Sequence, residues 1–295
     1  FVDSNDISLG DIDATGAFSV TALSGAIDDG AANGNGADVN VAGVAIFSAS
    51  GTIALDDQWN DFGDQINVDA QEFVLVAQSD LLLFDVDVDQ LAITAVGNVS
   101  DGEFGTVLVA GNASFTGSAV TLGDNAGNLA RFGSVTFNAS GVINISEDGS
   151  MNVAGSSTAG AGLNLLSTDD VTLNASVTVV GDTSIIAGTT SGGIAVNAKL
   201  KGSGTILLDA ADEITIDAAI DPTTVTLNAD DDITVNAAVV ASELITVSAG
   251  EDGSGSFILG AAGSLETIDS GSDITVATGS TSGDITLTGT TTALD

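Results

Sequence analysis

The sequence has no cysteine, no histidine and no tyrosine, and it has only three basic residues among 295. The absence of cysteine excludes disulfides, thiolate metal sites and thiol nucleophiles. The basic residues are Arg131, Lys199 and Lys201, and they face 41 acids, which gives a formal net charge of −38. So acidic a surface repels nucleic acids and anionic lipids, and we therefore predict no nucleic-acid partner.

Long hydrophobic runs are also missing. No stretch reaches the ~18 apolar residues that span a bilayer, and none has the pattern of a signal peptide, so we predict no membrane insertion. Aromatic residues make up 4% of the chain, whereas apolar residues make up 44%. The core is therefore expected to consist of Val, Ile, Leu and Ala. The chain begins at Phe1 rather than Met, so we expect a processed product or a piece of a longer chain.

What the sequence does have is an internal repeat. Four segments are aliphatic at positions one, three and seven, with Asn or Asp at position four and Ala at position five: 171–177, 194–200, 214–220 and 233–239. Three further strands are predicted between or after them, at 206–208, 225–227 and 245–247. Within each strand, aliphatic and polar residues alternate with the two-residue period of a half-buried strand. A unit of ~20 residues made of short strands predicts an all-β fold, a parallel β-helix (β-solenoid).

In such a solenoid, equivalent strands of successive coils pair in parallel. We expect Ile214 to stack over Ile233, Ile216 over Val235, and Ile220 over Val239. The position-four residues are predicted to form a structural ladder at a corner of the coil, because stacked amides can hydrogen-bond along a column: Asn174, Asn197, Asp217 and Asn236. At ~20–22 residues per coil, the chain would form a single continuous solenoid over residues 1–295, with thirteen or fourteen coils. A β-sandwich is the rival fold, but it does not account for a ~20-residue period.

The N-terminal half repeats more loosely. Residues 47–55 resemble 115–122, and each is followed by an acidic linker that ends in Phe-Gly, at Phe62 and Phe132. The linker around Phe62 is predicted to be a corner insertion with the phenyl ring as its plug. Residues 26–38, rich in Gly, Asn and Asp, are predicted to form a loop that leaves the coil.

The coil motifs and the segment LGDN…FGSVTF at 122–137 resemble those of the filamentous-haemagglutinin-like exoproteins of bacteria, which are secreted or surface adhesins. The resemblance covers most of the chain, most clearly 42–290. It implies a right-handed parallel β-helix at the cell surface or outside the cell, and it carries no catalytic residues. Neither Phe1–Leu9 nor the segment 285–295 has the features of a terminal cap. We therefore expect end-to-end self-association into a filament, or continuation of the same chain.

Acidic residues directly precede the first strand in several coils, and they are candidate metal ligands: Asp169, Asp170, Asp212, Glu213, Asp231 and Asp232. If they stacked ~4.8 Å apart in water, each neighbouring pair would repel by roughly 0.9 kcal/mol. A Ca²⁺ ion with oxygen ligands would reverse that sign. A solvated acidic face without bound metal is the other interpretation, and no other cofactor is predicted.

Catalytic residues are not predicted, because lyases and hydrolases built on β-helices generally need a basic cluster that three separated cations do not form. The interpretation that follows is a structural or adhesive extracellular element. The alternative is a carbohydrate-binding or carbohydrate-cleaving β-helix that contacts cell-surface glycans. Trp59, the only tryptophan, is either a local packing residue or a possible ligand contact that stacks on a sugar.

Overall fold

A computed structural model describes residues 1–30 and 37–293, and it divides into two compact units. Unit 1 comprises residues 1–140 and 144–146, and unit 2 comprises 141–143 and 147–295. Over these residues the fold is all-β without helix, a parallel β-solenoid of about 12 turns with ~21 residues per coil. The predicted fold class is therefore confirmed, with slightly fewer turns than expected. The described residues contain no helix that could cross a membrane.

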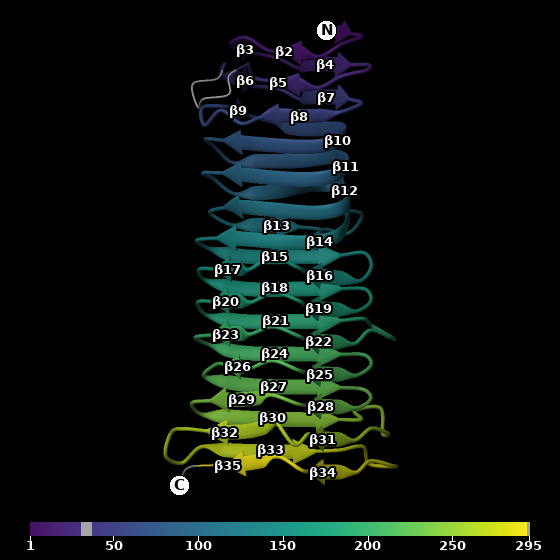
Figure 1. Cartoon of the computed structure of the whole chain (residues 1–295), viewed down its shortest axis with the longest axis vertical. Coiled ribbons are helices and arrows are strands. Elements are labelled where there is room, and N and C mark those ends of the chain that lie inside the picture. The colour runs from purple at the N-terminus through teal and green to yellow at the C-terminus, as the bar shows by residue number, and fades with distance from the viewer. Residues whose placement is uncertain (31–36, 294–295) are drawn as a thin grey trace. The chain divides into compact units, whose positions relative to one another are not determined.

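The coils of unit 2 contain three strands each, except the last described coil, which has two, and Figure 1 shows the strands lying one below another in columns. The first column holds β16 (Met151–Val153), β19 (Val171–Leu173), β22 (Ile194–Val196), β25 (Ile214–Ile216), β28 (Ile233–Val235), β31 (Phe257–Leu259) and β34 (Ile285–Leu287). The second holds β17 (Ser157–Ala159), β20 (Val177–Val179), β23 (Leu200–Gly202), β26 (Ile220–Asp221), β29 (Ala238–Ala241), β32 (Ser264–Thr267) and β35 (Thr290–Thr292). The third holds β18 (Gly162–Ser167), β21 (Asp182–Ala187), β24 (Thr205–Ala210), β27 (Thr224–Ala229), β30 (Leu244–Ala249) and β33 (Asp273–Ala277). Strand β15 (Val142–Glu147) contributes residues to both units.

The predicted stacking of aliphatic residues is confirmed. Ile214 pairs with Ile233 and Ile216 with Val235 in the parallel register of β25 and β28. Ile220 pairs with Val239 in the next column. All six of these side chains are fully buried. Parallel pairing between residues about twenty positions apart excludes the sandwich, in which neighbouring strands would be antiparallel hairpins.

The number of strands per coil differs from the sequence interpretation. The segment 214–220 was treated as one strand, but β25 ends at Ile216 and β26 begins at Ile220. The chain turns a corner between them, at Asp217 and Ala218. Ala218 is half-buried at this corner. The aliphatic residue at position seven therefore belongs to a separate sheet column.

Unit 1 begins with short strands and continues with long ones. The short strands are β1 (Val2–Asp3), β2 (Ile7–Ser8), β3 (Ile12–Ala14), β4 (Phe18–Ala22), β5 (Ile27–Asp28), β6 (Val39–Val41), β7 (Ala45–Ala49), β8 (Thr52–Leu55), β9 (Asp61–Phe62) and β13 (Val120–Leu122). The long strands are β10 (Gln65–Ala77), β11 (Leu81–Ala95), β12 (Val99–Gly117) and β14 (Leu129–Ala139). Strand β10 pairs with both β7 and β8, so one long strand continues two columns of the earlier coils.

In both copies of the loose repeat of unit 1, a phenylalanine of the first segment contacts the phenylalanine at the end of the following linker. The rings of Phe47 and Phe62 lie 6.1 Å apart at 83°, and those of Phe115 and Phe132 lie 5.8 Å apart at 71°. Phe62 is buried, as predicted for a plug. The prediction of a loop at 26–38 is wrong for Ile27–Asp28, because these two residues form strand β5. Residues 31–36 of that prediction lie outside the described residues.

Candidate functional site

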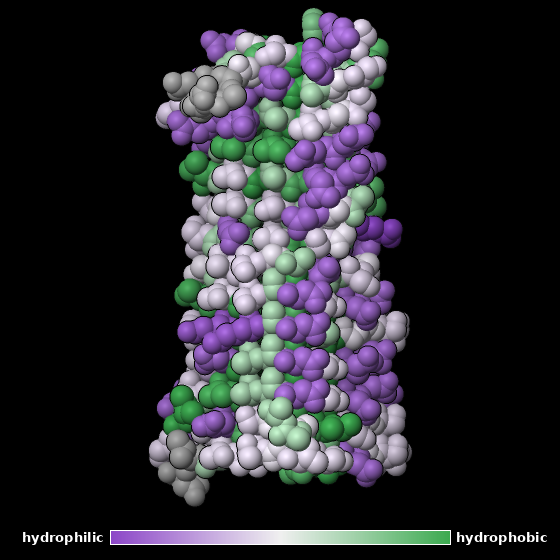
Figure 2. Space-filling model, in the orientation of Figure 1, coloured by the Kyte–Doolittle hydropathy of each residue, from purple (hydrophilic) through white to green (hydrophobic). Residues whose placement is uncertain are grey.

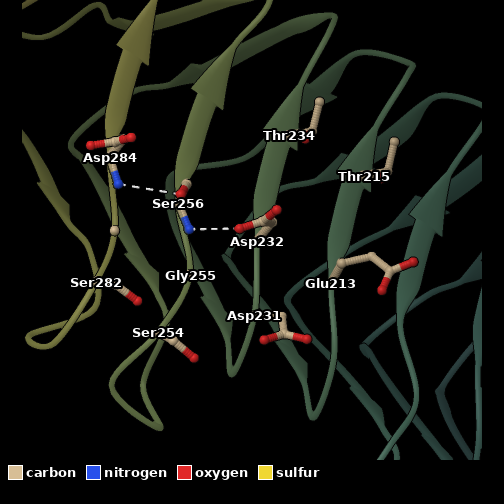
Figure 3. A pocket seen from close by; sticks show the side chains of 11 residues that line it. Glu213, Thr215, Asp231, Asp232, Thr234, Ser254, Gly255, Ser256, Ser282 and Asp284 are labelled. Atoms are coloured by element: carbon tan, nitrogen blue, oxygen red, sulfur yellow. Dashed lines mark hydrogen bonds between the residues drawn. The ribbon is translucent and has the colours of Figure 1, made fainter.

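A groove in unit 2 lies where successive coils enter the first strand column (Figure 3). It has a volume of about 540 Å³. Its lining is acidic and hydroxylated: Glu213, Thr215, Asp231, Asp232, Thr234, Ser254, Gly255, Ser256, Ser282, Gly283 and Asp284. Such a lining presents hydrogen-bond acceptors and hydroxyl groups to a ligand.

The groove is built by a ladder of hydrogen bonds between coils. The residue before each first-column strand stacks on its equivalent one coil away, because β25 pairs with β28, β28 with β31 and β31 with β34. Asp232 Oδ1 accepts the backbone N–H of Ser256 at 2.7 Å, and the Ser256 hydroxyl oxygen accepts the N–H of Asp284 at 3.2 Å. Figure 3 shows both contacts along one wall. The side chains of this wall therefore hold successive coils together.

Asp231 lies at the turn side of the groove. A side-chain hydrogen bond with Asp212 raises the pKa of Asp231 above its usual range, and burial and the neighbouring negative charges add to that shift. The two residues also contact through their backbones, since Asp231 N donates to Asp212 O at 3.3 Å. The raised pKa of Asp231 therefore follows from its position beside Asp212 in the preceding coil.

The structure brings together only part of the predicted metal-ligand set. Glu213 and Asp232 occupy adjacent coils of the groove, but the coil before them has Gly193 at the equivalent position. Asp170 lies beyond that glycine, and its Oδ1 accepts the Gly193 N–H at 2.9 Å. Asp169 accepts a hydrogen bond from Ser150 at 3.1 Å. The acidic column is thus interrupted by one coil.

Within residues 1–30 and 37–293, no three acidic side chains gather closely enough to hold a metal ion. Calcium binding at the six predicted residues stays a prediction, and the observed hydrogen bonds give Asp170 and Asp232 a different role. Each uses a carboxylate oxygen to satisfy a backbone donor of the following coil. Asp6 and Asp80 in unit 1, and Asp182 in unit 2, accept the N–H of Ala26, Asn98 and Thr205 in the same way.

The predicted corner residues do form hydrogen-bonded pairs. Asn197 Nδ2 donates to Asn174 Oδ1 at 2.9 Å, and Asn236 Nδ2 donates to Asp217 Oδ1 at 2.8 Å. The sequence analysis missed Asn152, whose Oδ1 accepts from Asn174 at 2.9 Å. Asn152 lies 22 residues before Asn174, which is about one coil, and this spacing could have indicated that the two residues stack. On the face shown in Figure 2, stacked rows of hydrophilic residues run through the part of the picture that holds unit 2.

Trp59 lies at the surface of unit 1, where 53% of it is exposed. Its backbone N–H donates to Asp57 Oδ1 at 2.9 Å, and its carbonyl accepts from Gln78 Nε2 at 3.1 Å. These bonds fix the backbone and leave the indole accessible. The exposed ring is more compatible with a ligand contact than with core packing.

Two clusters of buried polar residues in unit 1 were missed by the sequence analysis. In the first, Asp29 Oδ2 accepts the Asp57 N–H at 2.9 Å and the Asn60 Nδ2 at 3.1 Å. Asn60 Oδ1 in turn accepts the N–H of Val39 at 2.8 Å. The second cluster surrounds Asp101, which is also buried. Acidic residues are so frequent in this chain that nothing in the sequence marks these ones as buried.

The basic residues make few contacts. Lys199 Nζ lies 4.0 Å from Asp221 Oδ2, and both side chains are about half exposed. An exposed pair of this kind contributes on the order of 0–1 kcal/mol to stability. The pair therefore adds little to the fold.

Comparison with known proteins gives one match. A family model described as repeats of unknown function (DUF5649) matches residues 1–69, about a quarter of the chain. No curated protein and no solved structure matches. Over its first 69 residues the chain is therefore similar to repeats of unknown function, and these residues here form coils of a parallel β-solenoid.

Proposed function

We propose that this chain is a structural β-solenoid of a bacterial surface or secreted filament, as its resemblance to filamentous-haemagglutinin-like exoproteins implies. The observation that carries the proposal is that the repeated residues contact their equivalents in neighbouring coils. In unit 2 they form aliphatic columns, amide pairs and carboxylate contacts between coils. The repeated chemistry therefore serves stacking, which is the requirement of a stiff extended element.

The acidic surface contributes a second property. With a net charge of −38, copies of the chain repel one another sideways. This repulsion is screened beyond about 8 Å at about 0.15 M salt. An acidic exterior therefore opposes lateral clumping and leaves the coil ends as the surfaces that approach most easily.

The last described coil of unit 2 leaves apolar side chains uncovered. Ile285 and Leu287 occupy first-column positions that are fully buried at Phe257 and Leu259 one coil earlier, yet they are 50% and 53% exposed. Their strand β34 pairs with β31 on one side only among the described residues. A further coil, of the same chain or of another copy, would cover these side chains and pair with the open edge of β34.

Electron microscopy of the purified chain tests this proposal. We expect filaments or short linear stacks at about 0.15 M salt, and fewer of them at low salt, where repulsion is less screened. The double variant Ile285→Asp/Leu287→Asp should remain single, because it places charge on the uncovered coil. Single particles of the unaltered chain at all salt concentrations would remove the filament proposal.

A second candidate function is carbohydrate binding. It is favoured by the hydroxyl- and carboxylate-lined groove of unit 2 and, independently, by the exposed indole of Trp59 in unit 1. Hydroxyl and carboxylate groups hydrogen-bond sugar hydroxyls, and an exposed indole can stack on a sugar ring. Glycan-array binding that is lost in Trp59→Ala or Asp232→Asn would support this function, and an array without specific binding would count against it.

A further inference from the structure

The loop at residues 123–128 joins β13 to β14 in unit 1 and folds back over β12. Gly123 and Gly127 have φ of 69° and 104°, values that favour glycine. A Cβ on Gly127 would lie 2.7 Å from Cδ1 of Phe104, so the loop packs closely on this ring. Asn128 N donates to Asn125 O at 3.1 Å and closes a turn within the loop. The loop therefore packs against β12.

The loop encloses the carboxylate of Asp101. This residue is 5% exposed, and its Oδ2 accepts the Gly123 N–H at 2.7 Å. Its Oδ1 is buried and has no hydrogen-bond partner. Burial raises the pKa of Asp101, and the negative charge of Asp124 adds to that increase. A buried carboxylate oxygen without a donor is costly, which indicates that another group completes its environment.

The amide of Asn128 lies beside the same carboxylate. It lowers the pKa of Asp101, yet its Oδ1 and Nδ2 are both buried and outside hydrogen-bonding geometry. Asp124 is exposed at the mouth of the loop, and its Oδ1 accepts from Asn125 Nδ2 at 2.8 Å. The Asp101 carboxylate, the Asn128 amide and the charge of Asp124 thus lie near one another in unit 1. The chain has no histidine or cysteine that could supply a nitrogen or sulfur ligand.

We propose that Asp101 Oδ1, Asn128 Oδ1 and the Asp124 carboxylate bind a calcium ion. Calcium takes six to eight oxygen ligands from carboxylates, amide carbonyls and waters, and it tolerates irregular geometry. Zinc and copper favour imidazole or thiolate ligands, which this chain lacks. The two carboxylates balance the charge of a divalent ion, and waters at the exposed side of the loop complete the coordination.

The surface acids predicted from the sequence differ from this site in a way that matters for calcium. Asp170 and Asp232 also accept a backbone N–H from the next coil, but neither is among the residues with an unpartnered buried oxygen. The Asp101 site combines two acids with an amide, so it does not depend on a cluster of three acids. It is also independent of the filament role, since it concerns one loop within unit 1.

Calcium titration of the full 295-residue chain by calorimetry tests the site, in about 0.15 M KCl after treatment with a chelator. We expect one saturable site, at least tenfold weaker in Asp101→Asn and in Asp124→Asn. Asp182→Asn is the matched control, because it removes the same charge from an exposed residue that accepts the Thr205 N–H of the next coil and lies outside the loop. It should bind calcium as the unaltered chain does. Calcium at one hundred times the Kd should raise the Tm by roughly 5 °C.

The Asp124→Asn variant keeps the test valid if Asp101→Asn does not fold, because Asp124 is exposed. Unchanged affinity in Asp124→Asn, or only weak and unsaturable binding by the unaltered chain, would overturn the proposal. Magnesium binding as tight as calcium binding would overturn the choice of ion. If Asp101→Asn raises the Tm while calcium leaves the unaltered chain unchanged, Asp101 is instead a protonated acid paired with Asn128.

Discussion

Units 1 and 2 build the same type of coil from different side chains. In the described part of unit 2 no strand exceeds six residues, and the pairings β21–β24, β24–β27 and β27–β30 contain no register shift. In unit 1, β10, β11 and β12 have 13, 15 and 19 residues, and their pairings contain register shifts. Ten of the eleven phenylalanines lie in the first 140 residues.

This difference shows how core composition follows coil regularity. Coils of constant cross-section let Ile stack on Ile and Val on Val, so aliphatic residues fill the interior of unit 2. Register shifts bend a strand and change the local cross-section. Larger rings then fill the space, as at Phe47, Phe73 and Phe115, which are fully buried.

The largest effect that would test this comparison is the removal of a ring from unit 1. Phe115→Ala should lower the free energy of unfolding by about 3–5 kcal/mol, because it deletes a fully buried ring and its edge contact with Phe132. Urea denaturation followed by circular dichroism measures the loss. Phe1→Ala, at an exposed ring, should change stability by less than about 0.5 kcal/mol. A loss below about 1 kcal/mol in Phe115→Ala would mean that the rings do not carry the packing of unit 1.

A smaller effect is expected at the amide corner that distinguishes unit 2. Asn174→Ala removes hydrogen bonds to both Asn152 and Asn197, and it should cost about 1–2 kcal/mol. Asn236→Ala removes the bond to Asp217 and should cost about half as much. Urea denaturation of the two variants and the unaltered chain measures both losses in unfolding free energy, and hence their ratio. Equal losses, or none, would show that the amide pairs follow the corner geometry without stabilising it.

Regular stacking also predicts equal responses at equivalent positions. Ile214→Val and Ile233→Val should each cost about 1 kcal/mol and agree within about 0.5 kcal/mol, because the two side chains pair in register and are equally buried. The unfolding free energies of the two variants are the measurement. If the two losses in unfolding free energy differ by clearly more than about 0.5 kcal/mol, the coils of unit 2 are not uniform.

The smallest expected effect is a pH dependence at Asp29 in unit 1. Burial raises the pKa of Asp29 above its ordinary value of 3.8, so the folded state binds the proton more tightly than the unfolded state. Its contribution to stability is therefore largest below pH 3.8 and declines as the pH rises toward the folded pKa. Above that folded pKa, the contribution is constant.

Thermal melts of the unaltered chain and of Asp29→Asn from pH 7 down to pH 3.8 measure this contribution. As the pH falls, the Tm of the unaltered chain should rise relative to the Tm of Asp29→Asn, since only the unaltered chain gains a proton at this position. Asp209→Asn in unit 2 should show the same trend more weakly, because burial raises the pKa of Asp209 but its side chain is only half-buried. A difference in Tm that does not change with pH would contradict the raised pKa of Asp29.

Much of the regular part of the molecule follows from local pattern. The period of about twenty residues predicted the parallel solenoid, and aliphatic alternation predicted which residues stack, such as Ile216 on Val235. The pattern also predicted a corner at Asp217. It did not predict that β25 ends there and that a separate strand, β26, begins at Ile220. A two-residue strand after a turn keeps the same alternation as a continuous strand, so periodicity alone does not separate the two.

The candidate sites were less predictable. The acidic column was expected from residues that precede equivalent strands, but Gly193 interrupts it and Asp284 extends the groove beyond the predicted set. The pattern Asp-Ile-Thr at 232–234 recurs at 284–286, which was the available indication for Asp284. No comparable pattern marks Asp101 or Asp29, because isolated aspartates occur throughout the chain.

The sequence by itself determined the coil, its aliphatic interior and its acidic exterior, since these depend on residues close together in the chain. Only the tertiary structure decided which aspartates accept backbone donors, which are buried, and which face a groove. Those outcomes depend on the register between coils, and register depends on the length of every turn in between. The buried Asp101 accepts the N–H of Gly123 from the loop at 123–128, a contact that no local periodicity encodes.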